Sequence, residues 1–401
     1  MQALENIRIA DLSGYIAGAY CPTLLADLGA KVDKVEPFEG DAFRLLGAGF
    51  MGWNRGKRSI VIDLKKEEGR QVYYRMVERS QMVVENFRPG VSQRLGVEYE
   101  TIRRIKRDII YVRSLAHGST GPYSTHPGFD PLLQARSGQM ARQGGAGNPP
   151  VYYRVAVNDY MAAMASAFTA AIALYVHART GQGQEVESSL TNASIVAQSG
   201  EFMDYPGIPK AVEGGPYLKG LHPAWRLYQA GDTWLMIACA REEHWQALCR
   251  ALRLEDVGRR LTLAQVAACS ADDPELVSLI QDALSKKTGD VLAELEEAGV
   301  PCAPCLTGDE VMSDPHCEEN DLFVEYDHPT VGRLRQTGAM IKLSETPGHP
   351  ALPAPLLGQH TVEILQELGF SQEQIDDLLE RKVVGQYGVN VGVIAEFEED
   401  N

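Results

Sequence analysis

Apolar positions follow two different periods along the first half of the chain. Short apolar runs, several alternating with polar residues, predict β-strands, and longer stretches with helical periodicity lie between them. The predicted strands are IRIADL, KVDKVEP, RSIVIDL, MVVENF, IIYVRSL and QEVESSL. The predicted helices include GYIAGAYCPTLLADLGA, KEEGRQVYYRMVERS and YETIRRIKR. This alternation favours an α/β fold with a large Rossmann-like domain around a mostly parallel sheet.

Gly- and Pro-rich stretches divide the rest of the chain. Residues 115–157 are irregular, and YPGIPKAVEGGPYLKGLHP resembles a crossing linker. The strand TWLMIAC and the amphipathic helices after it predict a smaller α+β domain, and two helices close the chain. The predicted division is 1–200 for the N-terminal part of the large domain, 201–225 for a linker, 226–330 for the small domain, and 331–401 for a return linker with helices that complete the large domain.

The Ala-rich segment 159–178 predicts a buried core helix. Residues 160–176 carry no charge, but Ala, Ser and Thr dilute their hydrophobicity, and the run is shorter than the about 20 residues of a typical membrane span. The N-terminal MQALENIRIADL has neither the basic region nor the apolar region of a secretory signal. We therefore expect a soluble, cytoplasmic protein with no membrane partner.

Composition limits the function further. The 401 residues carry 38 Lys and Arg against 54 Asp and Glu, a net charge of −16, which argues against nucleic acid as a partner. Seven scattered cysteines do not form a disulfide pattern, and Cys302 and Cys305 in PCAPC lie in a Pro-rich segment that we expect to be extended. The nine histidines show no metal-binding spacing, so no metal site is predicted.

Two motifs suggest phosphate binding. GAGFMG matches G-x-G-x-x-G, but a basic turn and a strand follow it instead of the helix that a dinucleotide site needs. NRGKRS places Arg55, Lys57 and Arg58 around one glycine. Such a turn could hold phosphates through charge-assisted hydrogen bonds or could be a solvated charged turn, and the residues alone leave both interpretations open.

A third stretch, ENFRPG, follows a predicted strand at the usual ligand-binding edge of an α/β sheet. Asn86 offers a donor and an acceptor, Phe87 could stack on a base, and Arg88 could bind phosphate. Arg94 lies one or two helical turns further on. A plain loop would not need this combination.

Asp159 opens the Ala-rich helix, and no other acid follows until Glu185. Its carboxylate could simply cap the helix N-terminus, or it could be held at the mouth of a dry site. His117 and His126 lie in the irregular segment before it and, taken alone, are interpreted as loop residues.

Together these stretches resemble the class III coenzyme A transferases, the CaiB/BaiF family. The resemblance extends over nearly the whole chain. It rests on DLSGYIAGAYCPTLLADLGAKVDKVEP, NRGKRSIVIDLK, ENFRPGVSQRLGVEYE, GSTGPYSTHPGFDPLLQARSG, TGQGQEVESSL, AGVPCAPC and PAPLLGQHT.

The resemblance implies that Asp159 is the catalytic nucleophile, which forms an anhydride with the acyl group and then a thioester with CoA. The CoA-binding residues that it implies are Lys65, Asn86, Phe87, Arg88, Arg94, Gly128, Phe129 and Asp130, with Arg55 and Lys57 nearby. It also implies an acyl-CoA and a carboxylic acid as substrates, no tightly bound cofactor, and an interlocked dimer, either a homodimer or a heteromer with a related subunit.

Two alternatives remain from the sequence. A sister branch of the family racemises 2-methylacyl-CoA thioesters with an aspartate and a histidine, and Phe129 occupies the histidine position here. The chain could also be a non-catalytic subunit, although it retains Asp159.

Pro37 and Ile16 stand where some members carry an arginine and a glutamine, which makes formyl and oxalyl substrates less favoured. Tyr152, Tyr153 and Arg154 could contact substrate or pack in the core.

Overall fold

The structure is a computed structural model that describes residues 1–208, 214–287, 289–350 and 352–391. It divides into two compact units, a large one of residues 1–139, 152–206 and 318–401 and a small one of residues 140–151 and 207–317. The chain therefore leaves the large unit twice, for residues 140–151 and again after residue 206, and only the second exit lies within the predicted linker. It returns earlier than predicted, because the hairpin of β11 (Phe323–His328) and β12 (Gly332–Thr337) belongs to the large unit.

A seven-stranded sheet forms the centre of the large unit. Its order is β13-β3-β2-β1-β4-β5-β6, with every pair parallel except β13 with β3. The strands are β1 (Arg8–Asp11), β2 (Lys31–Glu36), β3 (Lys57–Ile62), β4 (Met82–Glu85), β5 (Ile110–Leu115), β6 (Glu185–Ser189) and β13 (Val384–Gly385). The direction of strand addition reverses between β1 and β4, the switch point at which α/β sheets bind ligands. The predicted α/β fold with a large parallel sheet is confirmed.

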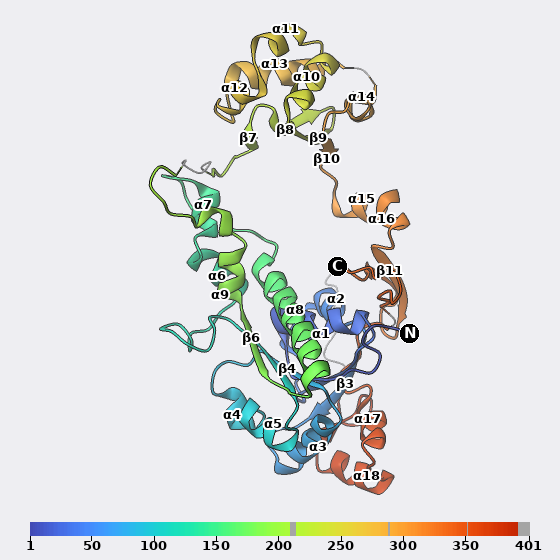
Figure 1. The fold of residues 1–401 in the computed structure, drawn as a ribbon. Helices are drawn as coiled ribbons and strands as arrows, with labels where there is room; N and C mark the ends of the chain where they lie inside the picture. The colour runs from blue at the N-terminus through green and yellow to red at the C-terminus, as the bar shows by residue number, and fades with distance from the viewer. Residues whose placement is uncertain (209–213, 288, 351, 392–401) are drawn as a thin grey trace. The chain divides into compact units, whose positions relative to one another are not determined.

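Helices cover both faces of this sheet (Figure 1). The helical segments of the large unit are α1 (Tyr15–Asp27), the 3-10 helix η1 (Ala42–Leu46), α2 (Ala48–Asn54), α3 (Glu67–Glu78), α4 (Val91–Leu95), α5 (Tyr99–Ile105), α6 (Asp130–Arg136), α8 (Val157–Thr180), α9 (Leu190–Val196), the 3-10 helix η2 (Ser199–Glu201), α17 (Thr361–Glu367) and α18 (Gln372–Glu380). GAGFMG lies mostly within α2, which follows η1 and not a strand, so it is not a dinucleotide-binding turn.

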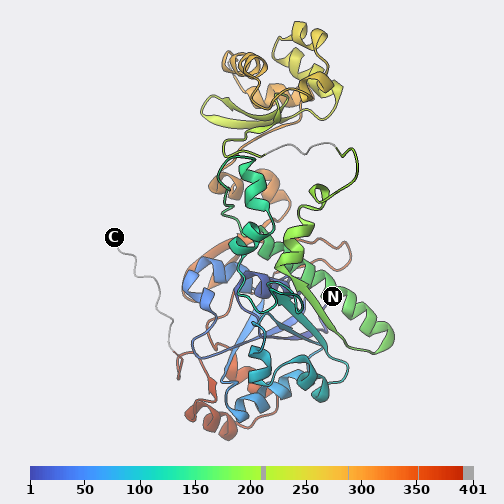
Figure 2. The same cartoon turned by 90° about the vertical axis from the view of Figure 1, so that its left-hand side faces the viewer.

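Successive strand residues pack into two different cores, as the pleat of a sheet requires. In β4, Val83 joins a core with α3, α5, α17 and α18, whereas Met82 and Val84 face α1 and α8. Figure 2 shows the C-terminal helices beside α3. Because both faces are covered, nearly every residue of the central strands is buried, and the segments after β1, β4 and β5 line one cavity.

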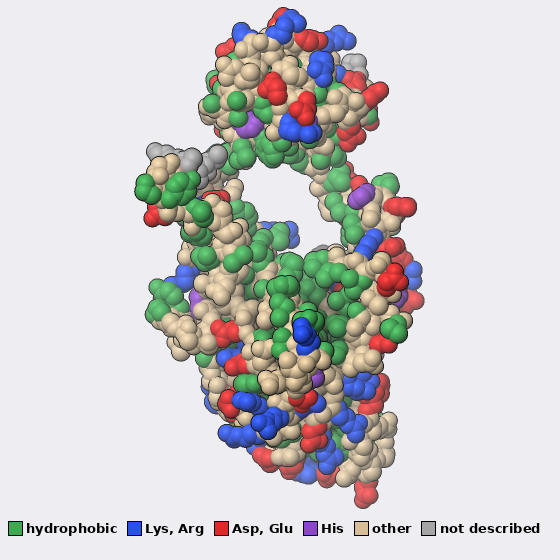
Figure 3. Space-filling view, in the orientation of Figure 1, with side chains coloured by type: hydrophobic (Ala, Val, Ile, Leu, Met, Phe, Trp, Pro, Cys, Tyr) green, Lys and Arg blue, Asp and Glu red, His purple; other side chains and the backbone are tan. Residues whose placement is uncertain are grey.

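Helix α8 buries only one of its faces. Ala162, Ala163, Ala170 and Ala173 are buried against α1 and the sheet, where their small side chains allow close helix packing. Phe168 is 69% exposed, and hydrophobic side chains gather over this helix in Figure 3. The expectation of a fully buried helix is wrong for the single chain. By length and composition, α8 is also the one helix among the described residues that could cross a membrane.

The small unit combines an antiparallel sheet with short helices, in agreement with the predicted α+β class. The sheet order is β10-β9-β8-β7, and Trp245 lies at the centre of its core. The strands are β7 (Gly220–His222), β8 (Trp225–Ala230), β9 (Thr233–Ala238) and β10 (Cys302–Pro304). The helices α7 (Gln139–Gly144) and α16 (Pro315–Glu319) begin or end at the boundary, and α10 (Glu242–Ala251), α11 (Glu255–Arg260), α12 (Leu263–Ala267), α13 (Pro274–Ser285), α14 (Val291–Glu297) and α15 (Gly308–Met312) lie within the unit. All seven cysteines are free, and β10 forms the middle of the PCAPC segment.

Candidate active site

A cavity of about 430 Å³ opens in the large unit at the switch point of the sheet. Its walls come from the segments that follow three strands: Tyr15 and Ile16 after β1, Asn86 to Pro89 after β4, and Ala116 to Pro131 after β5. Asp159, from the first turn of α8, completes the lining. The fold therefore brings the ENFRPG loop, the GFDP stretch and the candidate nucleophile to one site.

Asp159 is half-buried, and its carboxylate makes no hydrogen bond or ion pair with any residue in the described part of the chain. Burial and the neighbouring Asp130 carboxylate raise the pKa of Asp159 to about 7. A carboxylate with both oxygens free, facing a partly apolar cavity, can attack an electrophilic carbonyl once it is ionised. The alternative role considered for Asp159, capping of the α8 N-terminus, is excluded because its side chain makes no capping hydrogen bond.

Asp130 caps α8 in its place. Its Oδ2 accepts hydrogen bonds from the backbone N–H of Asn158 at 2.8 Å and of Asp159 at 3.1 Å. Its Oδ1 accepts one from Gln134 Nε2 at 2.5 Å, and the Asp130 residue is only 3% exposed. Both of its oxygens therefore hold the N-terminus of α8, and thus the backbone of Asp159, in place. Asp130 also lines the cavity, and its contact with CoA stays a prediction.

Asn86 fastens the end of β4 to the turn after β1. Its side chain accepts a hydrogen bond from the N–H of Gly14 at 2.9 Å and donates one to the Gly14 carbonyl at 2.8 Å. Gly18 makes room for this contact, since a Cβ there would lie 2.5 Å from Asn86 Cγ. The Asn86 amide thus shapes the cavity wall and retains one donor and one lone pair for a ligand.

Phe87 lines both this cavity and a second one of about 220 Å³. The second cavity lies at the carboxyl ends of β2 and β3, and Lys65 and Leu95 contribute to its lining. Arg88 lines the first cavity, and Arg94 is exposed on α4. None of Lys65, Arg88 and Arg94 forms an ion pair with the described residues, so these cations remain available for an anionic ligand.

Phe129 and Gly128 form the remaining wall. The Phe129 ring lies edge-on to Tyr15 at a centroid distance of 5.8 Å, and Tyr15 in turn contacts Phe43 at 4.8 Å. A Cβ on Gly128 would lie 2.2 Å from the Cβ of Ala116, so only glycine fits there. Tyr15 itself has φ of 59°, a left-handed conformation that costs roughly 1–2 kcal/mol outside glycine.

The family model described as CoA-transferase family III matches residues 4–361. The chain belongs to this family. Its relatives include the succinyl-CoA:mesaconate CoA-transferase of Haloarcula marismortui, 32% identical over 92% of this chain and 97% of the relative, and the succinyl-CoA–D-citramalate CoA-transferase of Chloroflexus aurantiacus, 30% identical over 95% and 98%. A CaiB/BaiF family protein from Brucella suis has a similar structure, with a TM-score of 0.81, 28% identity, and coverage of 92% of this chain and 99% of that one.

The predicted resemblance to the class III transferases is thus confirmed, and with it the assignment to CoA transfer. The prediction that Arg55 and Lys57 lie near bound CoA needs correction. Arg55 is fully buried and pairs with Asp27 at 2.6 Å, and Lys57 Nζ lies 2.9 Å from Asp11 Oδ2. NRGKRS is therefore neither a phosphate-binding turn nor a solvated one, because its cations neutralise buried acids.

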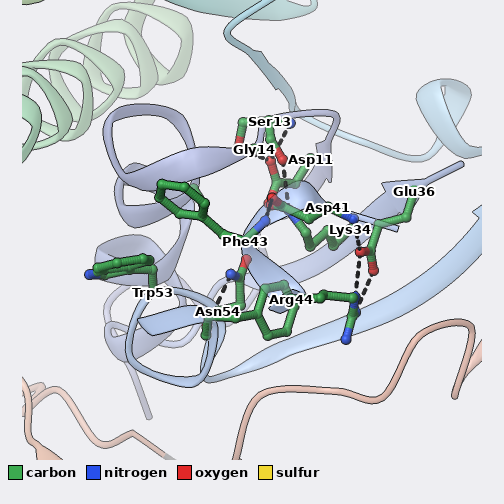
Figure 4. Close-up of polar contacts among 12 residues, drawn as sticks. Asp11, Ser13, Gly14, Lys34, Glu36, Asp41, Phe43, Arg44, Trp53 and Asn54 are labelled. Carbon is green, nitrogen blue, oxygen red and sulfur yellow. Dashed lines mark hydrogen bonds and ion pairs between the residues drawn. The ribbon is translucent and has the colours of Figure 1, made fainter. Parts of the chain in front are cut away.

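The sequence analysis missed the buried polar network that this family member carries behind the cavity (Figure 4). Lys57 also donates to the Ala19 carbonyl at 2.7 Å, and Lys34 Nζ contacts Asp41 at 3.0 Å and the Ser13 carbonyl at 2.6 Å. Burial lowers the pKa of Lys57 to about 8 despite Asp11. Lys and Asp inside otherwise apolar strands were the available signal, since such residues are rarely buried unless paired.

Phe43 and Trp53 lie next to this network, with ring centroids 5.3 Å apart, and Trp53 Nε1 donates to the Tyr160 hydroxyl at 3.0 Å. The network therefore supports Phe43, which lines the same cavity as the candidate nucleophile Asp159. Within the described residues, no group of three or more His, Cys, Asp or Glu side chains could hold a metal ion.

Proposed function

We propose that the protein transfers CoA from an acyl-CoA thioester to a free carboxylic acid, with Asp159 as a covalent nucleophile. The observation that carries this proposal is an unpartnered carboxylate facing a cavity whose other wall is the Asn86–Phe87–Arg88 loop. The family supplies CoA as the group transferred, and the geometry supplies a nucleophile within one cavity of the loop that we assign to CoA.

The reaction proceeds by two exchanges at Asp159. A carboxylate oxygen attacks the thioester carbonyl, the C–S bond breaks, and CoA leaves as a thiolate while a mixed anhydride forms. The thiolate then attacks the aspartyl carbonyl, which releases the first acid and leaves an aspartyl-CoA thioester. An acceptor carboxylate reverses both steps and departs as the new acyl-CoA. Exclusion of water protects the anhydride, and the partly apolar walls of the cavity favour this.

For CoA we propose that Phe87 and Lys65 contact the adenosine end in the second cavity, and that Arg88 and Arg94 bind the phosphates. Gly128 and Phe129 then line the path of the thioester arm. Arg88→Ala and Arg94→Ala should each weaken acyl-CoA binding about tenfold or more, since charge-assisted hydrogen bonds contribute roughly 1.5–3 kcal/mol. Arg104→Ala, an exposed arginine of α5 away from both cavities, is the matched control.

The deciding experiment is to mix the enzyme with acyl-CoA without an acceptor, quench it, and map adducts by mass spectrometry. The peptide that holds VAVNDYMAAM should carry CoA on Asp159, and the adduct should be absent from Asp159→Ala. A screen of mixed carboxylic acids for CoA exchange then identifies donor and acceptor. If no donor modifies Asp159 and the Asp159→Ala variant still transfers CoA, the proposal is wrong.

A racemase of 2-methylacyl-CoA is the second candidate, because His126 lines the same cavity as Asp159 and could supply a second acid/base group. Phe129 occupies the position expected for the racemase histidine and cannot move a proton. Deuterium exchange at the acyl Cα without an Asp159 adduct would favour this alternative.

The assembly that we propose is a dimer of interlocked chains, as the family resemblance implies. The exposed apolar face of α8 supports this proposal, because large apolar surfaces are usually covered by a second protein chain. A homodimer is the simplest form, and co-purification of a related subunit would indicate a heteromer. The cytoplasmic location, and the absence of nucleic-acid and membrane partners, remain predictions.

A further inference from the structure

Three of the polar side chains that line the Asp159 cavity have hydrogen-bond partners among the described residues. Asn86 holds Gly14, Ser114 Oγ donates to the Ala17 carbonyl at 3.2 Å, and Asp130 caps α8. The nucleophile apart, Tyr15, Arg88, Ser124 and His126 make no side-chain hydrogen bond with the described residues. Tyr15 contacts Phe129 through its ring, and Arg88 is assigned to CoA. Ser124 and His126 therefore have no assigned role in the proposed CoA transfer.

Ser124 and His126 belong to the segment between β5 and α6, and this segment is anchored on several sides. The N–H of His126 donates to the Tyr123 carbonyl at 2.9 Å, and the Tyr123 ring lies 5.4 Å from the His126 ring. The Arg136 guanidinium stacks over Tyr123 at 4.0 Å. His117 Nδ1 lies 3.1 Å from Thr191 Oγ1. The two side chains are therefore presented to the cavity by a stacked aromatic and basic cluster.

The cluster around Tyr123 contains basic side chains. His117, His126 and Arg136 gather around Tyr123, and Arg136 forms no ion pair within the described part of the chain. Burial lowers the pKa of His117, and the neighbouring Arg136 and His126 act in the same direction. The acids that line the same cavity are Asp130, whose oxygens cap α8, and Asp159 itself. Glu187 of β6 accepts from the N–H of Ser119 at 2.9 Å and contributes to the lining of neither cavity.

The substrates named for the two relatives, succinate with mesaconate or citramalate, all carry two carboxylates. In such an acid one carboxylate reacts at Asp159, and the other must be desolvated inside the cavity and needs donors there. We propose that Ser124 and His126, with Arg136 behind them, form the subsite for the distal carboxylate of a dicarboxylic acyl group. This inference rests on the proposed CoA transfer and specifies its substrate class.

The test compares two acceptors of equal chain length, succinate and butyrate, with the acyl-CoA donor found by the exchange screen. Wild type should prefer succinate. In His126→Ala, which loses a direct donor, the ratio of kcat/KM for succinate to that for butyrate should fall at least tenfold. In Arg136→Met the ratio should fall about threefold, because this variant loses a more distant charge and keeps the direct donors. Thr125→Ala, which changes the exposed residue between the two donors without touching the cavity lining, should keep the wild-type ratio.

Two outcomes would overturn the inference. Wild type could prefer butyrate, or His126→Ala could keep the ratio within twofold. An equal loss for both acids is a case of the second outcome and would assign His126 to the machinery common to all substrates. A second variant, Ser124→Ala, should lower the ratio in the same direction, and thermal melting reports whether each variant is folded. Failure of wild type to transfer CoA to any acid would instead refute the proposed function itself.

Discussion

At the scale of single residues, the site combines a reactive acid with another acid that is fixed in place. Asp130 uses both oxygens as hydrogen-bond acceptors and so remains next to Asp159 as a second negative charge. The same side chain therefore positions the nucleophile and opposes its ionisation. These two effects can be separated by experiment, because one acts on geometry and the other on pKa.

The first prediction concerns the stability cost of the nucleophile. The Asp159 pKa rises from 3.8 to about 7 on folding, so the native state binds the proton more tightly and loses relative stability as pH rises between these values. Asp159→Asn removes that cost and should be more stable than wild type by roughly 2–4 kcal/mol at pH 8. At pH 4 the two proteins should nearly coincide in urea denaturation. Equal differences at both pH values would contradict the raised pKa.

The second prediction concerns the pH dependence of catalysis. Because only ionised Asp159 attacks, kcat/KM should rise with pH to a plateau, with an apparent pKa of about 7. Asp130→Asn keeps one acceptor oxygen but removes the charge, so the rise should shift to lower pH while kcat falls through poorer positioning. Glu100→Gln, the same charge change at an exposed site on α5, should leave the profile in place. An unshifted profile in Asp130→Asn would mean that burial alone sets the pKa.

The sequence predicted Asp159, Phe87 and Arg88 as site residues because each lies at the start of a helix or just after a strand, and the structure places all three around one cavity. It did not show that Arg55 and Lys57 are buried in ion pairs, for one physical reason. Whether a charged side chain points to solvent or to a buried partner depends on residues distant in sequence, such as Asp27 for Arg55 and Asp11 for Lys57. The sequence alone does not show which distant residues become those partners.

At the scale of elements, the site depends on close contacts between the segments that follow β1, β4 and β5. Alternation of strands and helices predicted these elements within a few residues, because their apolar periods are strong. The order of strands across the sheet, and thus the meeting of the three segments, came only from the structure. The exposed face of α8 was missed because composition shows that a helix is apolar but not how much of it one chain can cover.

The third prediction tests the contact between α1 and the loop after β4. In Gly18→Ala the new methyl group would lie 2.5 Å from Asn86 Cγ, so Asn86 must give up its hydrogen bonds to Gly14. We expect a loss of roughly 1–3 kcal/mol in the free energy of unfolding, together with reduced acyl-CoA affinity. Gly52→Ala in α2, where a methyl group meets nothing within 4 Å, should be neutral or stabilising by up to about 1 kcal/mol. Similar effects for the two variants would exclude the steric explanation.

At the scale of the whole molecule, the fourth prediction concerns the apolar face of α8. Phe168, Ile172 and Tyr175 are 69%, 46% and 61% exposed, at helical spacing that places them on one stripe. We expect light scattering to show a dimer for wild type and a shift towards monomer or aggregate for Phe168→Glu with Ile172→Glu. The control Ala178→Glu adds a negative charge at an exposed position of α8 away from this stripe. A monomeric wild type would contradict the proposed assembly.

The return of the C-terminal segment to the large unit has a consequence for how the protein is made. Strand β13 pairs with β3, and Ile364 and Ile375 lie in the same core as Val72 and Val83, so this core joins both ends of the chain. During synthesis, the first two hundred residues leave the ribosome long before the helices that cover one face of their sheet. Until residues 361–385 are translated, α3 and α5 cover that face only in part, which makes the nascent chain a natural client for chaperones. A premature stop before residue 356 should therefore yield an aggregating product and not a smaller active enzyme.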